Sequence, residues 1–322
     1  EQSFKKIKDA IISGLNIMAN AGVTSIHEAG MTPKDVKAFI SLAESNSLPI
    51  RVYGMLDGNN DELMKHWFAQ GPLIDKSGFL DIRSIKVFYD GSLGSRTALM
   101  EEPYSDQIGK SLATERISTK KILQLGPKAA DKGFQMAVHA IGDKGNNQVL
   151  KLYEEILDTN GIFDHRWRIE HAQVLFPNFY SRAAELKVLA SIQSSHAVGD
   201  SKWAEDRIGS ERIQDAYAWQ NILKSGVRLL LNSDLPGEPW KPMETLYFAV
   251  NRKPLDSTKE SKGWYMNQAL TVEEALKAMT IDNAYGAFQE KKLGSIEINK
   301  LADFIIIDQN PLTVGSEDIK NI

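Results

Sequence analysis

Short apolar runs alternate with helix-compatible stretches along most of this sequence, and that alternation limits its fold more than any other feature. The first helical stretch, residues 4–18, places apolar side chains three and four positions apart, on one face. Alternation of this kind is typical of parallel strands joined by crossover helices, and it predicts an α/β protein. Seven runs have the composition of strands: 23–27, 50–55, 82–88, 134–139, 167–170, 188–193 and 227–231.

Polar and ionisable residues gather at the ends of nearly all these runs. In parallel α/β folds the carboxyl ends of the strands carry function. A doubly wound sheet would show this bias in only a few loops near a switch point, so the pattern favours a closed (β/α) barrel. Such a barrel needs eight strands, and seven runs are present. The residues at the run ends are His27 and Glu28, Asp90, His139, Glu170 and His171, Gln193 with His196, and Asp234.

The pattern changes after Leu270. The string TVEEALKAMT, residues 271–280, starts with Thr and has Glu three positions later, the capping-box start of a helix. Residues 293–312, LGSIEINKLADFIIIDQNPL, are typical of two strands joined by a turn with no helix between them. We therefore expect a barrel over residues 1–286 and a small C-terminal β segment over residues 287–322.

Composition narrows the partners and the chemistry. A chain of 322 residues with 42% hydrophobic content can fill a sizeable core. The 38 Lys and Arg and 42 Asp and Glu are interspersed, so no basic stripe indicates nucleic acid or anionic lipid, and a small-molecule substrate is expected. No run approaches the ~18 apolar residues of a membrane span. Because the chain has no cysteine, a metal site must use His, carboxylate or Lys.

Four residues form the central candidate site: Lys86, His139, His171 and Asp234, each at or near the end of a different expected strand. A barrel gathers such strand ends around one axis. Two imidazoles and a carboxylate suit zinc, and the aspartate can take a proton from metal-activated water. Yet a lone His at a strand end is more often a satisfied polar residue. A lysine there is usually an ion-pair partner, unless CO2 adds to its amine. The residues alone leave both interpretations open.

The strings IKVFYDGSLGSRTA, AVHAIGD, RIEHAQ and NSDLP, in this order, resemble amidohydrolase family 3, which includes proteins like N-substituted formamide deformylase. TVEEALKAMT and GSIEINKLADFIIIDQNPL are similar to the end of the same family, so the resemblance runs from residue 22 to residue 311. It implies a TIM-like barrel with a β-sandwich built from both chain ends. It also implies hydrolysis of an amide-type, non-peptide C–N bond by metal-activated water.

The same resemblance implies roles for single residues. Lys86 matches the lysine that becomes carboxylated and bridges metals. His139 and His171 match the metal ligands of strands five and six. Asp234 matches the aspartate of strand eight, which binds metal and acts as general base. The expected cofactor is one or two divalent ions, zinc first among them, with a CO2-derived carbamate on Lys86.

One family feature has no counterpart here. These hydrolases carry a His-x-His pair at the end of the first barrel strand, and none of the six histidines forms such a pair. The string GVTSIHEAG instead resembles the approach to the second strand. We therefore expect strand one, the His-x-His pair and part of the sandwich to lie upstream of Glu1. Two strands would then lack a neighbour, and we expect this chain alone to aggregate, swap elements or pair with another copy.

Four further residues are candidates for substrate binding. Asp90 and Arg96 lie in a Gly-rich loop, where they would hold a substrate carbonyl or carboxylate. The alternative is a loop stabilised by its own hydrogen bonds, with Arg96 in a salt bridge. Gln193 and His196 follow the seventh expected strand and would contact the substrate.

Two other functions stay open from the sequence. One is a barrel that binds a small molecule without catalysis, or an inactive fragment of such a hydrolase, since part of the metal site is missing. The other is an interaction or regulatory protein, which should expose a large apolar patch at the open edge of the barrel. The sequence does not indicate the compartment.

Overall fold

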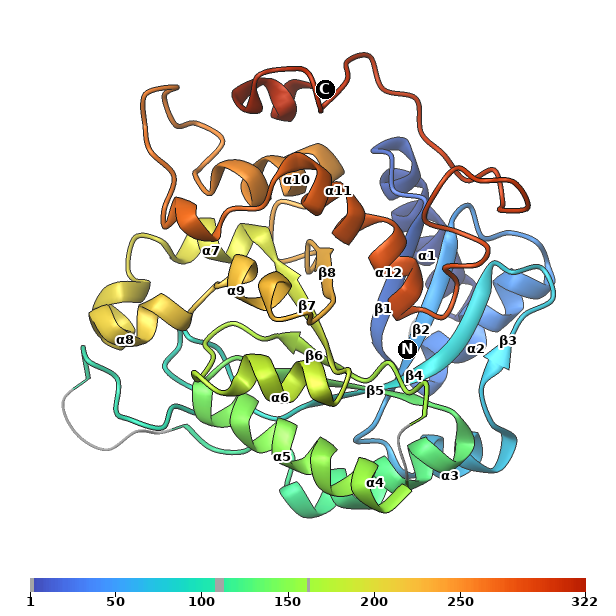
Figure 1. The fold of residues 1–322 in the computed structure, drawn as a ribbon. Coiled ribbons are helices and arrows are strands. Elements are labelled where there is room, and N and C mark those ends of the chain that lie inside the picture. The colour runs from blue at the N-terminus through green and yellow to red at the C-terminus, as the bar shows by residue number, and fades with distance from the viewer. Residues whose placement is uncertain (1–2, 108–112, 161–162) are drawn as a thin grey trace. The chain divides into compact units, whose positions relative to one another are not determined.

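The structure, a computed structural model, describes residues 3–107, 113–160 and 163–322. Each of the seven runs predicted to be strands forms one, and a two-residue strand, β3, was not predicted. Figure 1 follows these elements along the chain. The strands are β1 (Ser25–Met31), β2 (Arg51–Asp57), β3 (Leu73–Ile74), β4 (Leu80–Phe88), β5 (Gln135–Ala140), β6 (Arg168–His171), β7 (Leu189–Gln193) and β8 (Leu229–Asn232).

Helices separate most of the strands, as the alternation predicts. The start of α2 is set by a capping box, in which Thr32 and Asp35 bond each other's backbone N–H groups. None of the described helices has the length and apolar character needed to cross a membrane. The helices are α1 (Phe4–Asn20), α2 (Pro33–Glu44), α3 (Asp61–Gln70), α4 (Thr119–Lys132), α5 (Asp143–Asn160), α6 (Phe179–Glu185), α7 (Ser194–Asp200), α8 (Ala204–Arg212), α9 (Trp219–Lys224), α10 (Pro242–Asn251), α11 (Val272–Met279) and α12 (Ile281–Gly286), with 3-10 helices η1 (Ile213–Asp215), η2 (Met266–Gln268) and η3 (Ser316–Asn321).

The chain divides into two compact units, and each is described by itself. Strands β4 and β5 and helix α5 contain residues of both units. Unit 1 consists of Glu1–Val87, Ile117–Val138 and Glu155–Trp167, and unit 2 of Phe88–Arg116, His139–Glu154 and Arg168–Ile322.

Unit 1 contains a parallel sheet in the order β1-β2-β4, and β3 pairs antiparallel with the first residues of β4. Six of the seven residues of β2 are buried, because a parallel strand covered on both faces has no solvent side. Helix α2 packs against β1, and α3 packs against β2. Lys86 lies near the end of β4 and is 4% exposed.

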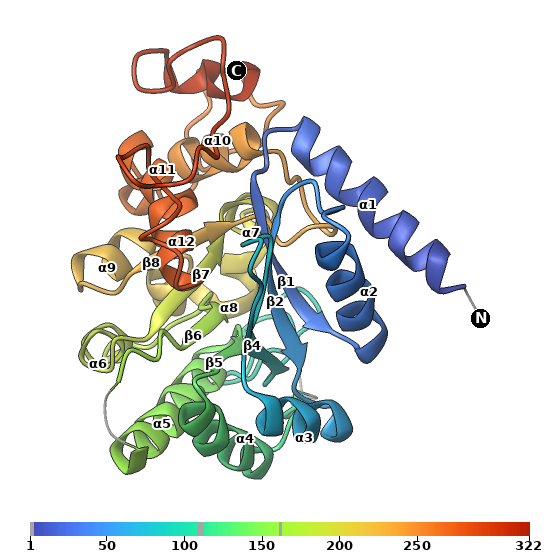
Figure 2. The same cartoon turned by 90° about the vertical axis from the view of Figure 1, so that its right-hand side faces the viewer.

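Unit 2 contains the parallel strands β6, β7 and β8. Their register pairs Arg168 with Leu189 and Gln193 with Asn232, so the carboxyl ends of neighbouring strands finish at one edge. Helices α9, α11 and α12 contact β8 (Figure 2). This edge therefore brings the polar residues that follow β6, β7 and β8 close together.

The C-terminal region differs in part from the prediction. The capping box of Thr271 and Glu274 at the start of α11 is confirmed. The two strands expected between residues 293 and 312 are absent, and η3 is the regular element found in residues 287–322. The side chains of Ile298 and Ile306 are 93% and 90% exposed. That prediction of strands is wrong because an alternating apolar pattern shows that a segment can pair, whereas a strand forms only beside a partner. The domain boundary at residue 286 stays a prediction.

Candidate functional site

Three side chains from successive strand ends of unit 2 come together. His171 ends β6, His196 lies in α7 directly after β7, and Asp234 follows β8. One ring nitrogen of each histidine and one carboxylate oxygen of Asp234 all lie within 4.8 Å of one another. Two imidazole nitrogens and a carboxylate oxygen are a donor set that zinc and similar cations take in proteins.

The backbone at these strand ends is unusual. His171, Ala172 and Asp234 have φ angles of 79°, 42° and 55°, in the left-handed region that residues other than glycine seldom adopt. Such conformations persist only where the surrounding structure holds them, and they concentrate at functional sites. The chain therefore turns sharply where β6 ends and again just after β8.

Neighbouring strands fix the orientation of the His171 ring. Its Nδ1 lies 2.7 Å from Oε1 of Gln193, an amide oxygen that can only accept a hydrogen bond. Nδ1 therefore carries the proton, and the lone pair of the neutral ring is on Nε2. Gln193 in turn donates to Oδ1 of Asn232 at 2.9 Å, and Asn232 donates to the Ser191 hydroxyl at 3.0 Å. Supporting contacts of this kind orient metal-ligating histidines.

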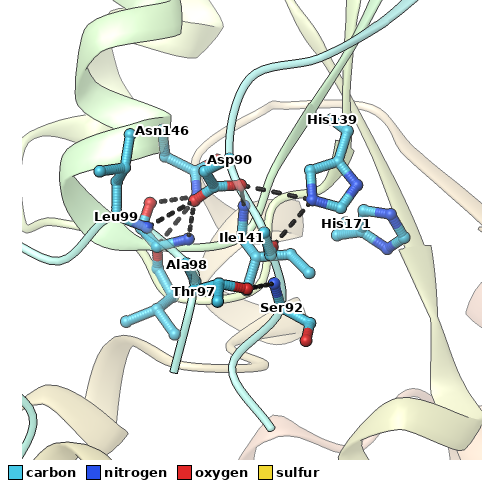
Figure 3. A network of polar contacts seen from close by, with 12 residues as sticks. Asp90, Ser92, Thr97, Ala98, Leu99, His139, Ile141, Asn146 and His171 are labelled. Atoms are coloured by element: carbon cyan, nitrogen blue, oxygen red, sulfur yellow. Dashed lines mark hydrogen bonds and ion pairs between the residues drawn. The ribbon is translucent and has the colours of Figure 1, made fainter. Parts of the chain in front are cut away.

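His139 is the second-last residue of β5. Its ring meets the His171 ring edge-on, with 4.5 Å between the ring centroids (Figure 3). Nε2 of His139 donates to the carbonyl oxygen of Gly91 at 2.9 Å and lies 3.3 Å from Oδ1 of Asp90. Nδ1 therefore bears the lone pair. It is buried and accepts no hydrogen bond from the described residues. A buried acceptor left open beside a second imidazole fits a metal ligand.

Asp90 ties the loop after β4 to the turn after β5 (Figure 3). Its side chain is fully buried, with Oδ1 accepting from the backbone N–H of Ile141 and Oδ2 from those of Gly142 and Leu99, each at 2.9 Å. The carboxylate sits before the first turn of α5, where the helix dipole favours negative charge. In this structure Asp90 holds backbone and the His139 ring. Its role in substrate binding stays a prediction.

Two glycines of the AVHAIGDKG string make this close approach feasible. A Cβ on Gly142 would lie 2.0 Å from the carbonyl oxygen of Leu99, and a Cβ on Gly145 would lie 2.6 Å from Oδ2 of Asp90. Both distances are shorter than any van der Waals contact. The spacing of these glycines is therefore explained by the packing of the Asp90 loop on the start of α5.

Arg96 forms a bidentate salt bridge with Asp106, in which Nε donates to Oδ1 at 3.0 Å and Nη2 donates to Oδ2 at 2.8 Å. Arg207 of α8 also donates to Asp106, at 2.9 Å. The hydrogen bond from Arg96 holds the pKa of Asp106 below its usual value. This is the salt-bridge alternative of the sequence analysis, and a contact of Arg96 with substrate stays a prediction.

Lys86 and the other predicted ligands lie in different units. Lys86 is buried on β4 in unit 1, whereas His139, His171 and Asp234 belong to unit 2. The assignment of Lys86 as a carboxylated, metal-bridging residue stays a prediction.

The sequence pattern placed His196 with the substrate, whereas the structure places it beside the ligand atoms. Its Nε2 lies 3.6 Å from Oδ2 of Asp234 and 4.0 Å from Oε1 of Glu238. Burial lowers the pKa of His196, which favours the neutral ring, although the two carboxylates oppose that shift. Burial also raises the pKa of Glu238, a residue that no sequence signal singled out.

A small cavity of about 180 Å³, including its open mouth, adjoins His171 and His196. One part of its wall is polar, with Gln173, Gln193 and Tyr217. The other part is apolar. The lining residues are His171, Gln173, Ile192, Gln193, His196, Tyr217 and Trp219. That volume includes open solvent, and the enclosed part of the cavity has room for about one water molecule.

Parallel strands with imidazoles and a carboxylate at their carboxyl ends define a class, the (β/α) proteins that can hold a cation at the strand ends. The chain belongs to the amidohydrolase family, because the model of family 3, described as "Amidohydrolase family", matches residues 1–322. The predicted family is thereby confirmed.

Individual relatives agree with this family. The chain is 30% identical over 315 residues to YtcJ of Bacillus subtilis (strain 168), covering 96% of this chain and 57% of the relative. It is 23% identical over 335 residues to N-substituted formamide deformylase of Arthrobacter pascens, covering 100% and 59%. It is 36% identical over 244 residues to LONG AFTER FAR-RED 3 of Arabidopsis thaliana, covering 76% and 41%. The chain thus spans roughly half the length of these relatives.

Two solved structures share the fold. A metal-dependent hydrolase from Pyrococcus horikoshii OT3 has a TM-score of 0.86 and 28% identity, covering 98% of this chain and 62% of that one. A metal-dependent hydrolase from Pyrococcus furiosus has a TM-score of 0.84 and 31% identity, and the match covers 97% of this chain and 62% of that one. The predicted α/β class of a TIM-like (β/α) barrel is confirmed.

Proposed function

We propose that the intact protein is a metal-dependent hydrolase that cleaves an amide-type, non-peptide C–N bond. The observation that carries this proposal is the geometry of the ligand types in unit 2. Donor atoms of His171, His196 and Asp234 lie within 4.8 Å of one another, and the His139 ring adjoins the His171 ring. Family membership over residues 1–322 supports the same function.

The donor set fits a divalent cation such as zinc. His139 would contribute Nδ1 and His171 would contribute Nε2, the nitrogens that bear the lone pairs. A cation there would satisfy the buried Nδ1 of His139 and balance the charge of Asp234. His196 lies close enough to join the set. A carbamate on Lys86 would add an anionic ligand and allow a second ion.

A bound divalent cation polarises a carbonyl group and lowers the pKa of water. Asp234 is the residue proposed as general base. Its side chain is 51% exposed, so substrate and water can reach the carboxylate. Asp234 would accept a proton from the attacking water and return it to the leaving nitrogen. The His196 ring, with Nε2 3.6 Å from Oδ2 of Asp234, would help to orient this carboxylate.

The amide-type bond is the narrower part of the proposal. A relative named N-substituted formamide deformylase aligns with the whole chain. The cavity beside the ligands combines amide and hydroxyl groups with the apolar faces of Ile192 and Trp219. N-benzylformamide is a suitable first substrate.

Replacement of Asp234 by Asn tests the proposal in the intact protein. The amide of Asn keeps the shape of the side chain but cannot accept the proton from water, so kcat for N-benzylformamide should fall at least about 10³-fold. Formate release measures the rate, and circular dichroism checks the fold. Asp158→Asn, at an exposed position of α5, is the matched control and should keep full activity. An unchanged kcat in Asp234→Asn contradicts the assignment.

A further inference from the structure

The acceptor that orients the His139 ring is a backbone carbonyl, so its position depends on how the loop after β4 folds. Gly91 supplies that carbonyl, at 2.9 Å from Nε2 of His139. The loop closes on itself, because Gly91 N–H donates to the Thr97 carbonyl oxygen and Ser92 N–H donates to Oγ1 of Thr97, both at 3.1 Å (Figure 3). A Cβ at Gly91 would lie 2.0 Å from Oγ1 of Thr97, so the two arms pack directly against each other. Residues 91–98 therefore form a closed loop, in which a shift of the tip carries the Gly91 carbonyl with it.

The tip of the closed loop is held by Arg207 of α8, whose side chain is 11% exposed. Nη1 of Arg207 donates to the carbonyl oxygen of Leu93 at 3.0 Å and also to that of Gly94. Its Nε donates to Oδ2 of Asp106 at 2.9 Å, and Asp106 also accepts from Arg96 of the closed loop. Three acceptors in fixed directions match the planar fork of a guanidinium, and the single ammonium group of a lysine does not reproduce that geometry.

A second arginine of α8 makes similar contacts with another part of the same connection. Nη1 of Arg212 donates to the carbonyl oxygen of Glu102 at 2.9 Å, and its Nη2 donates to that of Pro103 at 2.8 Å. Neither acceptor lies in the closed loop. The two arginines therefore bind different stretches of one connection to the same helix, and of the two it is Arg207 that holds the stretch with Gly91.

We propose that Arg207 is a positioning residue of the candidate metal site. By holding the closed loop on α8, Arg207 keeps the Gly91 carbonyl at Nε2 of His139, and the ring then presents its buried Nδ1 to the cation. Contacts around a metal ligand set its orientation, and their loss weakens metal binding. The inference rests on the proposed function, because the metal site is part of that function. It adds that the affinity for the cation depends on a residue that acts through the closed loop rather than as a ligand.

The zinc affinity of the intact protein tests this role. Competition with a chelator gives the dissociation constant for zinc of wild type and of each variant, and circular dichroism checks the folds. Arg207→Met should bind zinc about 10-fold more weakly than wild type, because the Gly91 carbonyl is no longer held in place. Arg207→Lys should also bind zinc more weakly, since it keeps the positive charge near Asp200 but loses the planar fork. Arg212→Met is the matched control on the same helix and should bind zinc as wild type does.

Cobalt(II) in place of zinc gives a second measurement that a purely structural role would not change. Its d–d absorption bands report the geometry of the ligands around the ion. These bands should shift in Arg207→Met, where the His139 ring loses its fixed acceptor, and stay unchanged in Arg212→Met.

The outcomes separate the positioning role from the proposed function. Zinc binding that is weakened in the Arg207 variants, in a protein that hydrolyses no amide, supports the positioning role and refutes the proposed function. Unchanged zinc binding in the Arg207 variants overturns the positioning role and leaves the proposed function intact. Equal weakening in Arg212→Met also overturns it, because the effect would then follow from any loss of contact with α8. A wild-type protein that binds no divalent ion refutes both, and if Arg207→Met does not fold, the milder Arg207→Lys decides.

Discussion

The two imidazoles at the ends of β5 and β6 are oriented by oxygens that can only accept hydrogen bonds. The carbonyl oxygen of Gly91 accepts a hydrogen bond from Nε2–H of His139, and Oε1 of Gln193 accepts one from Nδ1–H of His171. The sequence predicts both histidines, because each follows an apolar run in a parallel fold. It does not predict their partners. Asp90 and Gln193 were expected to meet substrate, and only the three-dimensional arrangement shows that each of them contacts a histidine ring.

Asp200 gives a pH-dependent prediction at the same scale. Burial raises its pKa to about 6, against hydrogen bonds from Tyr217 and Gln173 and the charge of Arg207, which lower it. Its usual pKa is 3.8, so the folded state binds more protons than the unfolded state between pH 4 and 6. Stability is therefore lost as pH rises through this window, by up to about 2 kcal/mol.

Asp200→Asn should remove this contribution. Urea denaturation at several pH values from 4 to 6.5 measures the free energy of unfolding of wild type and variant. Wild type should lose stability relative to the variant as pH rises, whereas the exposed control Asp158→Asn should follow wild type. Parallel pH profiles for wild type and Asp200→Asn would count against the raised pKa.

At the scale of elements, the seven strands were predictable because strands buried on both faces leave continuous apolar runs in the sequence. The loop after β4 was predictable only as a Gly-rich loop. Its attachment to the start of α5 depends on contacts between distant segments, such as Asp90 with Ile141 and Gly142. The prediction of two C-terminal strands was wrong for a related reason, because a strand needs a pairing partner that the local sequence pattern does not reveal.

Gly145→Ala tests the packing of this loop. Alanine in a helix normally stabilises it by up to about 1 kcal/mol relative to glycine. At Gly145 the new Cβ would lie 2.6 Å from Oδ2 of Asp90, so we expect destabilisation by about 1–3 kcal/mol instead. Urea denaturation measures the change. Gly14→Ala in α1, where no atom lies within 4 Å of the new Cβ, is the control and should be neutral or stabilising. Equal effects at the two positions would refute the packing argument.

At the scale of the whole molecule, the family and the fold class followed from ordered motifs and from strand–helix alternation. Both can be predicted from the order of residues along the chain. The candidate metal site depends on the convergence of distant strand ends, and His196 lies in its cluster although a substrate contact was predicted for this residue. The chain spans 41–59% of three relatives, so the activity of the intact protein has to be measured rather than transferred.

The metal content of the purified intact protein tests the central claim most directly. Inductively coupled plasma mass spectrometry should find at least one divalent ion per chain, with zinc foremost. His171→Ala should lose most of this metal, because it removes Nε2 from the cluster, while His66→Ala in α3 should retain it. Circular dichroism verifies that each variant is folded. Metal-free wild type, or a folded His171→Ala protein with undiminished metal content, would contradict the account.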